Sequence, residues 1–263
     1  MTTGKSIAAI SGRRRAASPI RASTEADITG IHNWLKLEEA AAVTDKNWEL
    51  TLQAHQQAKL LVYVDRQSQV AVGYQWGALL EPGILQVRSD MRHQGIGRKL
   101  VQHRITQARR QNQGILYIQC KPRSSIPFWR RMGFTLLEDK DSVRQYAYRL
   151  LHRARPLPPG GEPVEVSIRF YPEEAKWKAD TAPFMTASPP ACVYPEGHVR
   201  LGERVYGLSR FPNTRDVVVE VIVNGQRRYR DKAKYDAAAN VGLQRCRNGY
   251  FIDQIPTAPP SIA

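Results

Sequence analysis

The chain has 263 residues, of which 42% are hydrophobic and 24% are charged. This composition is typical of a globular protein and argues against extended disorder, and the length fits one large or two medium-sized domains. No apolar segment approaches the roughly 18–20 residues that a membrane-spanning helix needs, so we expect no membrane partner. The 39 Lys and Arg residues outnumber the 24 Asp and Glu residues, and the net charge of +15 favours polyanionic partners such as nucleic acid or a phosphate-rich cofactor.

The cysteines and the N-terminal segment indicate the compartment. Cys120, Cys192 and Cys246 are too few and too far apart for a disulfide framework or a zinc site, so no metal is expected. Residues 1–18 contain small residues and an arginine triplet but no hydrophobic periodicity. We interpret them as a flexible basic tail without a signal peptide, and the chain as a cytoplasmic protein.

Between residues 19 and 151 the hydrophobic pattern alternates between strand and helix periods. Thr24 and Asp27 have the spacing of a helix N-cap, and Ile28, Ile31 and Leu35 follow at helical spacing. The resulting order β, α, α, β, β, β, α, β, α, β, β predicts an α/β domain built on a mixed sheet. After the first strand and helix we expect a helix over 46–57, strands over 60–64, 70–80 and 84–87, a helix that includes Leu100 and Ile105, a strand over 115–118, a helix over 126–132 and strands over 134–138 and 143–151.

The rest of the chain differs in composition and in hydrophobic pattern. Residues 153–163 contain four prolines and two glycines, which predicts a semi-rigid linker. Beyond it we expect a small, mostly β domain with strands over 164–170, 217–223 and 250–255, a loop-rich segment over 171–197 and a short helix over 232–239. Asn224-Gly225 is a strong type I′ hairpin signal between 217–223 and 226–230.

One segment carries chemistry, and it runs from Leu85 to Leu100 with the sequence LQVRSDMRHQGIGRKL. A strand ends, the chain turns, and Gly95 and Gly97 open a helix whose first residues are basic. Glycines let backbone N–H groups approach a ligand closely, and a helix N-terminus offers unpaired N–H donors to an anion. The segment matches neither a phosphate-binding Walker loop nor a dinucleotide-binding fingerprint, and two glycines alone also fit tight packing.

The whole string is more specific than its two glycines. Val87-x4-Arg92-x2-Gly95-x-Gly97-x2-Leu100 resembles motif A of the GNAT superfamily of N-acetyltransferases, and PFWRRMGF over 127–134 resembles motif B. The resemblance covers about residues 19–151, in the family's order of elements. It implies a GNAT-like mixed sheet flanked by helices, and a chain divided into a basic tail (1–18), an acetyl-CoA-binding domain (19–152), a linker (153–163) and a mostly β accessory domain (164–263).

The resemblance implies an acetyl-CoA-dependent N-acetyltransferase that passes acetyl directly to a primary amine. The turn would bind the pyrophosphate through backbone amides, and residues 85–87 would meet the pantetheine and the acetyl carbonyl where their strand separates from 115–118. The helix from Ser124 would flank the thiol end. The implied cofactor-binding residues are Leu85, Gln86, Val87, Arg92, His93, Gln94, Gly95, Ile96, Gly97 and Arg98.

Two positions depart from the family pattern. Trp129 stands where many relatives have a tyrosine acid, and Gln119 lies near the position of a glutamate base; neither side chain transfers a proton at neutral pH. Three explanations stay open: water moves the protons, a residue of the second domain such as a tyrosine or His198 completes the site, or the domain binds acetyl-CoA without acetylating. No catalytic residue is predicted, and we interpret Cys120 as a buried inert thiol.

The acceptor stays open among a small amine, a protein amine and aminoacyl-tRNA, the last because motif B and the basic surface faintly resemble a toxin branch of the family. The alternative function is a non-catalytic acetyl-CoA-binding module whose C-terminal domain binds a partner or nucleic acid. A homodimer is one possible assembly.

Two groups of basic residues each have two interpretations. The first group would bind the 3′-phosphate of CoA or form a solvated helix face, and it consists of Arg123, Arg130 and Arg131. The second group would bind RNA or another polyanion, or protect a hairpin edge by its charge; it consists of Arg227, Arg228, Arg230, Lys232 and Lys234, interleaved with Tyr229 and Tyr235.

Overall fold

The computed structural model describes residues 18–38, 45–77, 83–137, 144–209 and 216–257. The chain divides into two compact units. The first comprises Met1–Trp76 and Leu85–Gly97, and the second comprises Gly77–Ile84 and Arg98–Ala263. The boundary expected near 153–163 stays a prediction.

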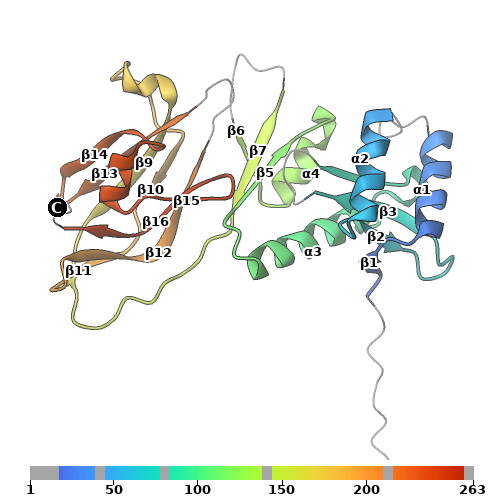
Figure 1. Cartoon of the computed structure of the whole chain (residues 1–263), viewed down its shortest axis with the longest axis horizontal. Coiled ribbons are helices and arrows are strands. Elements are labelled where there is room, and N and C mark those ends of the chain that lie inside the picture. Colours follow the sequence, from blue (N-terminus) through green and yellow to red (C-terminus); the bar gives the residue numbers. More distant parts are fainter. Residues whose placement is uncertain (1–17, 39–44, 78–82, 138–143, 210–215, 258–263) are drawn as a thin grey trace, which may run out of the picture. The chain divides into compact units, whose positions relative to one another are not determined.

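The first unit contains a four-stranded sheet and two helices (Figure 1). The strands follow the order of the chain, with β1 antiparallel to β2 and β2 antiparallel to β3. The elements are β1 (Ile20–Ala22), α1 (Glu25–Leu37), α2 (Asp45–Gln56), β2 (Leu61–Val64), β3 (Ala71–Trp76) and β4 (Ile84–Val87).

Helix α1 begins at the predicted cap. The Thr24 side chain accepts the backbone N–H of Asp27, and the Asp27 carboxylate accepts the N–H of Thr24 at 2.8 Å, which completes a capping box. Behind the cap, Ile31 and Leu35 are fully buried. Helix α2 is held to the sheet by a buried hydrogen bond, 2.9 Å long, that the Trp76 indole donates to the Thr51 hydroxyl of the helix.

The second unit begins with the rest of the predicted α/β region. Its strands form a three-stranded antiparallel sheet in the order β5-β7-β6. The predicted order of elements is confirmed, but the strands form two sheets, and β4 and β5 are each an end strand of their own sheet. The elements here are α3 (Ile96–Arg110), β5 (Ile115–Gln119), α4 (Ile126–Arg131), β6 (Thr135–Leu137) and β7 (Tyr146–Leu150).

The C-terminal region is mostly β, as predicted, and forms a two-layer sandwich. One layer has the order β10-β9-β13-β14 and the other β15-β16-β12-β11-β8, and the pairings are antiparallel. The strands are β8 (Glu162–Pro163), β9 (Val166–Pro172), β10 (Met185–Ala187), β11 (Ala191–Tyr194), β12 (His198–Leu208), β13 (Val217–Val223), β14 (Gln226–Lys232), β15 (Gln244–Cys246) and β16 (Gly249–Pro256).

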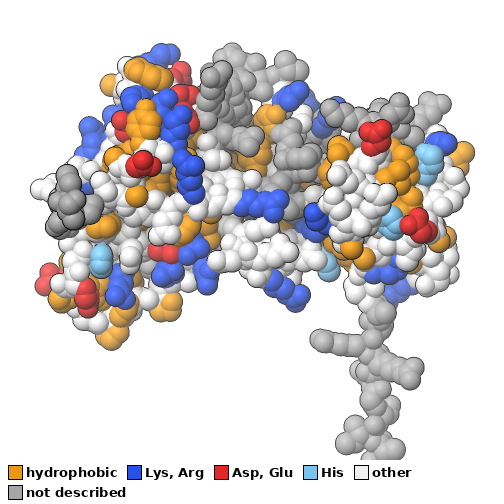
Figure 2. All heavy atoms as spheres, in the orientation of Figure 1, with side chains coloured by type: hydrophobic (Ala, Val, Ile, Leu, Met, Phe, Trp, Pro, Cys, Tyr) orange, Lys and Arg blue, Asp and Glu red, His pale blue; other side chains and the backbone are white. Residues whose placement is uncertain are grey.

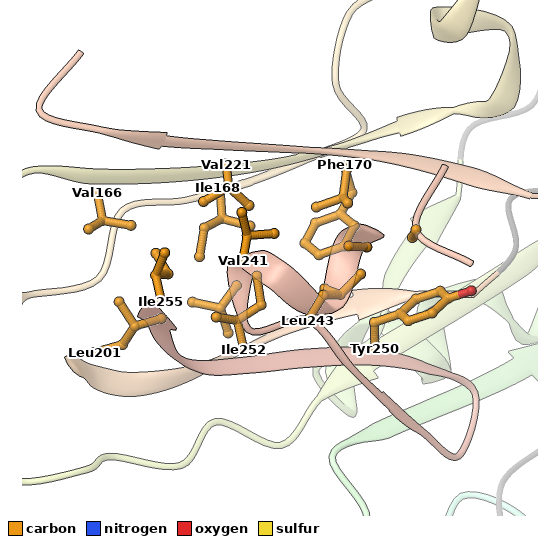
Figure 3. Packing of buried hydrophobic residues seen from close by; sticks show 14 of the residues in the cluster. Val166, Ile168, Phe170, Leu201, Val221, Val241, Leu243, Tyr250, Ile252 and Ile255 are labelled. Carbon is orange, nitrogen blue, oxygen red and sulfur yellow. The ribbon is translucent and has the colours of Figure 1, made fainter. Parts of the chain in front are cut away.

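Alternating side chains of both layers make one dry core (Figure 3). Ile168 and Val221 point from the upper layer toward Leu201 and Ile252 of the lower layer, and all four are almost completely buried. The period of two along each strand puts every second residue in this core, because successive strand side chains point to opposite faces.

Strand β12 serves two cores. Its residues Val199 and Leu201 belong to the sandwich core, whereas Tyr206 and Leu208 pack with Ile115 and its neighbours on the β5-β7 sheet. The Asn248 amide adds a hydrogen bond of 3.0 Å to the Ile115 carbonyl. Within the second unit, the sandwich and the three-stranded sheet are therefore joined by packed side chains as well as by the chain between them.

The segment 153–163 lies against the sandwich. The Arg155 N–H donates to the Gly202 carbonyl at 2.8 Å, the Tyr194 hydroxyl donates to the Pro158 carbonyl at 2.7 Å, and Glu162–Pro163 pair with β11 as β8. These contacts hold both ends of the predicted linker to β11 and β12.

The predicted helix over 232–239 is wrong. Lys232 continues β14, where it pairs with Val218, and a 3₁₀ helix follows over Asp236–Val241. The strand ladder takes Lys232, and the six residues of the 3₁₀ helix are too few to offset the cost of nucleating an α-helix. Gly242, at φ 78°, ends the turn. The segment 171–197, predicted as loop, contains the short strands β10 and β11.

Candidate acyl-CoA site

The predicted turn follows β4 directly. Arg88 continues the strand by donating its N–H to the Val72 carbonyl of β3 at 2.9 Å, and a 3₁₀ turn over Ser89–Met91 then reverses the chain. His93 and Gly95 both have left-handed backbone angles, with φ of 64° and 78°. Only then does α3 begin, at Ile96, so the first amides of the helix follow two left-handed residues.

The space beside Gly95 is open. A Cβ atom built at this residue meets no atom within 4 Å, and the neighbouring Arg92, His93 and Gln94 are exposed. Ile96, in contrast, is only 3% exposed and anchors the start of the helix in the core. The turn therefore presents backbone to solvent on a rigid base, which is what close approach of a ligand requires.

Glu38 supports this turn and was not predicted. It caps the C-terminus of α1, and its Oε1 accepts the Ser89 N–H at 2.6 Å, while its Oε2 lies 3.6 Å from the Arg92 guanidinium. Arg92 also donates from Nε to the Val87 carbonyl at 3.1 Å. Contacts across 51 residues fix the turn, and no local pattern in the sequence could have indicated them.

Both arginines of the turn before α3, Arg88 and Arg92, are already paired. Arg88 binds both oxygens of Asp90, at 2.7 and 2.9 Å, and these hydrogen bonds are the main cause of a pKa of Asp90 below its usual value. Arg92 faces Glu38. Arg98 and the backbone amides at the start of α3 are thus the groups of the predicted set best placed to meet an anion.

A model of a known protein family matches a segment of the chain that includes this turn. Residues 56–136 match the family model described as an acetyltransferase (GNAT) domain. The sequence of these residues is thus similar to that of a GNAT domain. The match includes the whole of motif A and motif B, so the resemblance stated from those motifs is confirmed.

Solved structures with similar folds share low sequence identity with the chain. A GNAT-family acetyltransferase from Staphylococcus aureus is 19% identical, with a TM-score of 0.41, and covers 50% of this chain and 98% of its own. A ribosomal-protein-alanine N-acetyltransferase from Brucella melitensis is 23% identical, with a TM-score of 0.38, and covers 50% and 99%. A Mycobacterium tuberculosis protein in complex with CoA is 16% identical, with a TM-score of 0.40, and covers 50% and 98%. No curated protein matches the chain.

In the second unit, Trp129 of the matched segment is a core residue. It is 8% exposed and lies edge-on to Phe128 and Phe134, with ring centroids 5.0 and 5.2 Å apart. The backbone N–H of Phe134 donates to the Trp129 carbonyl at 3.1 Å. The indole therefore fills space between motif B aromatics, and an indole has no proton to give at neutral pH.

The end of β5 offers one thiol and one amide. Gln119 is half-buried, whereas Cys120 is only 2% exposed, and burial raises the pKa of its thiol to about 11. A thiol with this pKa stays protonated at neutral pH and is a poor nucleophile. Cys120 is thus a buried side chain, as interpreted from the sequence.

The other candidate residues lie apart from the turn in the chain. His198 begins β12 and alternates with Val199 of the sandwich core, so it lies on the outer face of its sheet. In the part of the chain that the structure describes, no three His, Cys, Asp or Glu side chains gather where they could hold a metal ion. None of the helices in these ranges has the length and apolar character needed to cross a bilayer.

Proposed function

We propose that this chain is a GNAT-type N-acyltransferase that passes acetyl from acetyl-CoA to a primary amine. One observation carries the proposal: within the matched GNAT domain, an exposed turn with two left-handed residues, His93 and Gly95, leads into the N-terminus of the 15-residue helix α3. The family model supplies the class of reaction, and the turn supplies a place for phosphate.

The turn suits a diphosphate for electrostatic reasons. The first amides of α3 have no partner within the helix, and they carry partial positive charge that complements an anion. Arg98 adds a full charge in the first turn, and no acidic residue stands there. In our proposal the backbone from Arg92 to Arg98 holds the pyrophosphate, and Leu85, Gln86 and Val87 contact the pantetheine as an added strand would.

The chemical step needs a neutral amine. Its nitrogen attacks the acetyl carbonyl carbon, the C–S bond breaks, and the thiolate of CoA leaves and takes up a proton. Backbone N–H groups of β4 stabilise the oxyanion that forms between these events. We assign neither proton to a side chain, because Trp129 and Gln119, at the family's usual positions, do not ionise at neutral pH. The acceptor stays open among small amines, protein amines and aminoacyl-tRNA.

The same two residues favour a second candidate, a module that binds acetyl-CoA without transferring acetyl. Both readings predict binding, and only the first predicts release of free CoA in the presence of an amine. The presence or absence of thiol release across a panel of amines, measured with saturating acetyl-CoA, separates them.

Calorimetric titration with acetyl-CoA tests the proposal. Native protein should bind in the low micromolar range, on the order of −8 kcal/mol. Gly95→Glu should abolish binding, because the substitution puts a carboxylate and a strained backbone at the site of the phosphates. Gly160→Glu is the matched control, since Gly160 also has positive φ (88°) and open space, but lies in the segment 153–163. Absence of binding by native protein, or equal loss in both variants, would refute the proposal.

A further inference from the structure

A long segment of the chain contains no acidic residue. From Met91 to Leu137 there are 47 residues with ten Lys or Arg and neither Asp nor Glu. Salt bridges of the described residues pair many cations of the chain with carboxylates, but among these residues none pairs a carboxylate with Arg109, Arg110, Arg130 or Arg131. The next acidic residues, Glu138, Asp139 and Asp141, fall outside the described residues.

The fold gathers part of this charge at one place in the second unit. Arg109 and Arg110 end α3, and Arg130 and Arg131 end α4. Arg149 of β7 stands next to both helix ends. We call these five residues the arginine cluster.

The position of Arg149 follows from its contacts. Its guanidinium donates to the carbonyl of Met132, just after α4, and lies so near Gly133 that a Cβ there would be 3.3 Å from Cζ. Burial and the charge of Arg109 lower the pKa of Arg149, so the end of α3 is close to the same guanidinium. The other four arginines are exposed.

A structural role accounts for part of this arrangement. Cations in the last turn of a helix interact favourably with its carbonyl end. This effect does not require two consecutive arginines on each of two helices, nor a fifth beside them, because every added cation repels the others. Such an accumulation without acids is typical of a surface that binds a polyanion.

The basic residues of β14 differ from the arginine cluster in having acidic partners. Arg227 is 2.9 Å from Glu220, Lys232 is 2.5 Å from Glu173, and Lys176, beside them, is 2.9 Å from Asp231. In Figure 2, blue and red side chains alternate over this part of the molecule, whereas the surface around α3 shows blue without red. The β14 group that the sequence suggested for RNA is therefore largely neutralised, which fits its other reading as a protected hairpin edge.

We propose that the arginine cluster binds the phosphate backbone of a nucleic acid strand. The cluster lies about 18 Å along α3 from Arg98, at about 1.5 Å per residue, so one diphosphate at the start of the helix cannot reach it. A polymer with regularly spaced phosphates can neutralise several of the five charges together. This inference goes beyond the proposed acyl transfer and does not depend on it.

The test measures binding of the full chain to a fluorescent 12-nucleotide single-stranded RNA across a series of salt concentrations. Four arginines that each contact a phosphate predict a slope of log K against log salt near −3, from about −0.7 per contact. Arg109→Gln/Arg110→Gln and Arg130→Gln/Arg131→Gln should each weaken binding about tenfold at low salt and reduce the slope by about 1.4. Double-stranded RNA and DNA of equal length show which form is preferred.

Matched control variants distinguish RNA binding at the arginine cluster from a general effect of net charge and from binding of acetyl-CoA. Lys59→Gln/Arg66→Gln removes two exposed cations of the first unit, so it has the same net charge as each cluster variant and should bind RNA like native protein. Gly95→Glu should keep RNA binding while it loses acetyl-CoA, and both cluster variants should keep acetyl-CoA. The proposal is overturned if the control loses as much RNA affinity as the cluster variants, if Arg130→Gln/Arg131→Gln weakens acetyl-CoA instead of RNA, or if polyglutamate of equal charge displaces the RNA equally well.

Discussion

Gly95 and Gly207 have surroundings of opposite kinds. Beside Gly95, in the turn before α3, a Cβ would meet nothing within 4 Å. Beside Gly207, in β12 of the sandwich, a Cβ would lie 2.0 Å from the ring of Phe170. The first glycine leaves room for a ligand, and the second leaves room for a neighbouring side chain. Substitutions in the turn should therefore change binding, whereas those in the sandwich should change stability.

The largest effect is expected in the sandwich. Phe170 is fully buried, so Phe170→Ala should lower the free energy of unfolding by about 3–5 kcal/mol, through lost burial and the cavity left behind. Urea denaturation measures this change, and the remaining folded protein should bind acetyl-CoA with native affinity. A loss of affinity at temperatures where the variant is folded would show that the two regions are not separable.

A double-mutant cycle sharpens this point. Gly207→Ala in the native background places a methyl group against the Phe170 ring and should be strongly destabilising. In the Phe170→Ala background the same methyl group enters the vacated space, so the second substitution should cost much less. Equal costs in both backgrounds would contradict the close contact on which the comparison rests.

The next effect concerns the cap of α1. Burial raises the pKa of Asp27, but hydrogen bonds from Arg21 and Thr24 outweigh it, and the folded-state pKa lies below the usual value. A carboxylate with a lowered pKa stabilises the fold above the unfolded-state pKa, near 3.9, and this contribution is lost as the pH falls through the folded-state value. Asp27→Asn should cost about 1–2 kcal/mol at pH 7 and flatten the stability profile below about pH 4.

Denaturation curves at several pH values measure this contribution. Asp180→Asn, at an exposed position of the second unit, is the control and should leave the profile unchanged. An acid-dependent slope that persists in Asp27→Asn would assign it to other carboxylates. Acetyl-CoA affinity at pH 7 should be native in both variants.

Elements with local signals were predictable from the sequence. The Thr24 cap forms its box, and Asn224 and Gly225 have φ values of 48° and 74°, as a type I′ turn requires. Strand β13 matches its predicted range residue for residue. In the candidate site, the left-handed angle of Gly95 follows the same logic, because a glycine before a helix is a local preference.

Features that depend on distant residues were not predictable. Strand β12 was missed because Gly202 and Gly207 interrupt its hydrophobic pattern, and its register shifts between Arg200 and Val205. Position 207 requires a glycine because the ring of Phe170, which lies on another strand, leaves no space for a Cβ atom. Glu38 contacts the turn only once α1 and β4 are folded together. Neither the contact between Gly207 and Phe170 nor that between Glu38 and the turn produces a pattern within a short stretch of sequence.

Glu38 allows a finer test of the turn, with an effect near 1 kcal/mol. Glu38→Gln keeps an oxygen for the Ser89 N–H and removes a negative charge beside Arg92, so acetyl-CoA should bind a few-fold more tightly than to native protein. Glu38→Ala removes the acceptor as well and should bind about fivefold more weakly than Glu38→Gln, since one hydrogen bond is worth about 1 kcal/mol. Calorimetry measures both. Equal affinities of the two variants would show that Glu38 does not hold the turn.

Cys120 should give the smallest effect, because it lies in the segment that matches the family model but is as buried as the sandwich core. With a thiol pKa of about 11, roughly one molecule in 3,000 carries the thiolate at pH 7.5. Cys120→Ala should therefore leave acetyl-CoA affinity and any amine-dependent thiol release within about twofold of native, and cost about 1 kcal/mol of stability. Iodoacetamide at pH 7.5 should leave Cys120 unmodified, as peptide mapping would show. Rapid inactivation that disappears in Cys120→Ala would instead make this thiol part of the reaction.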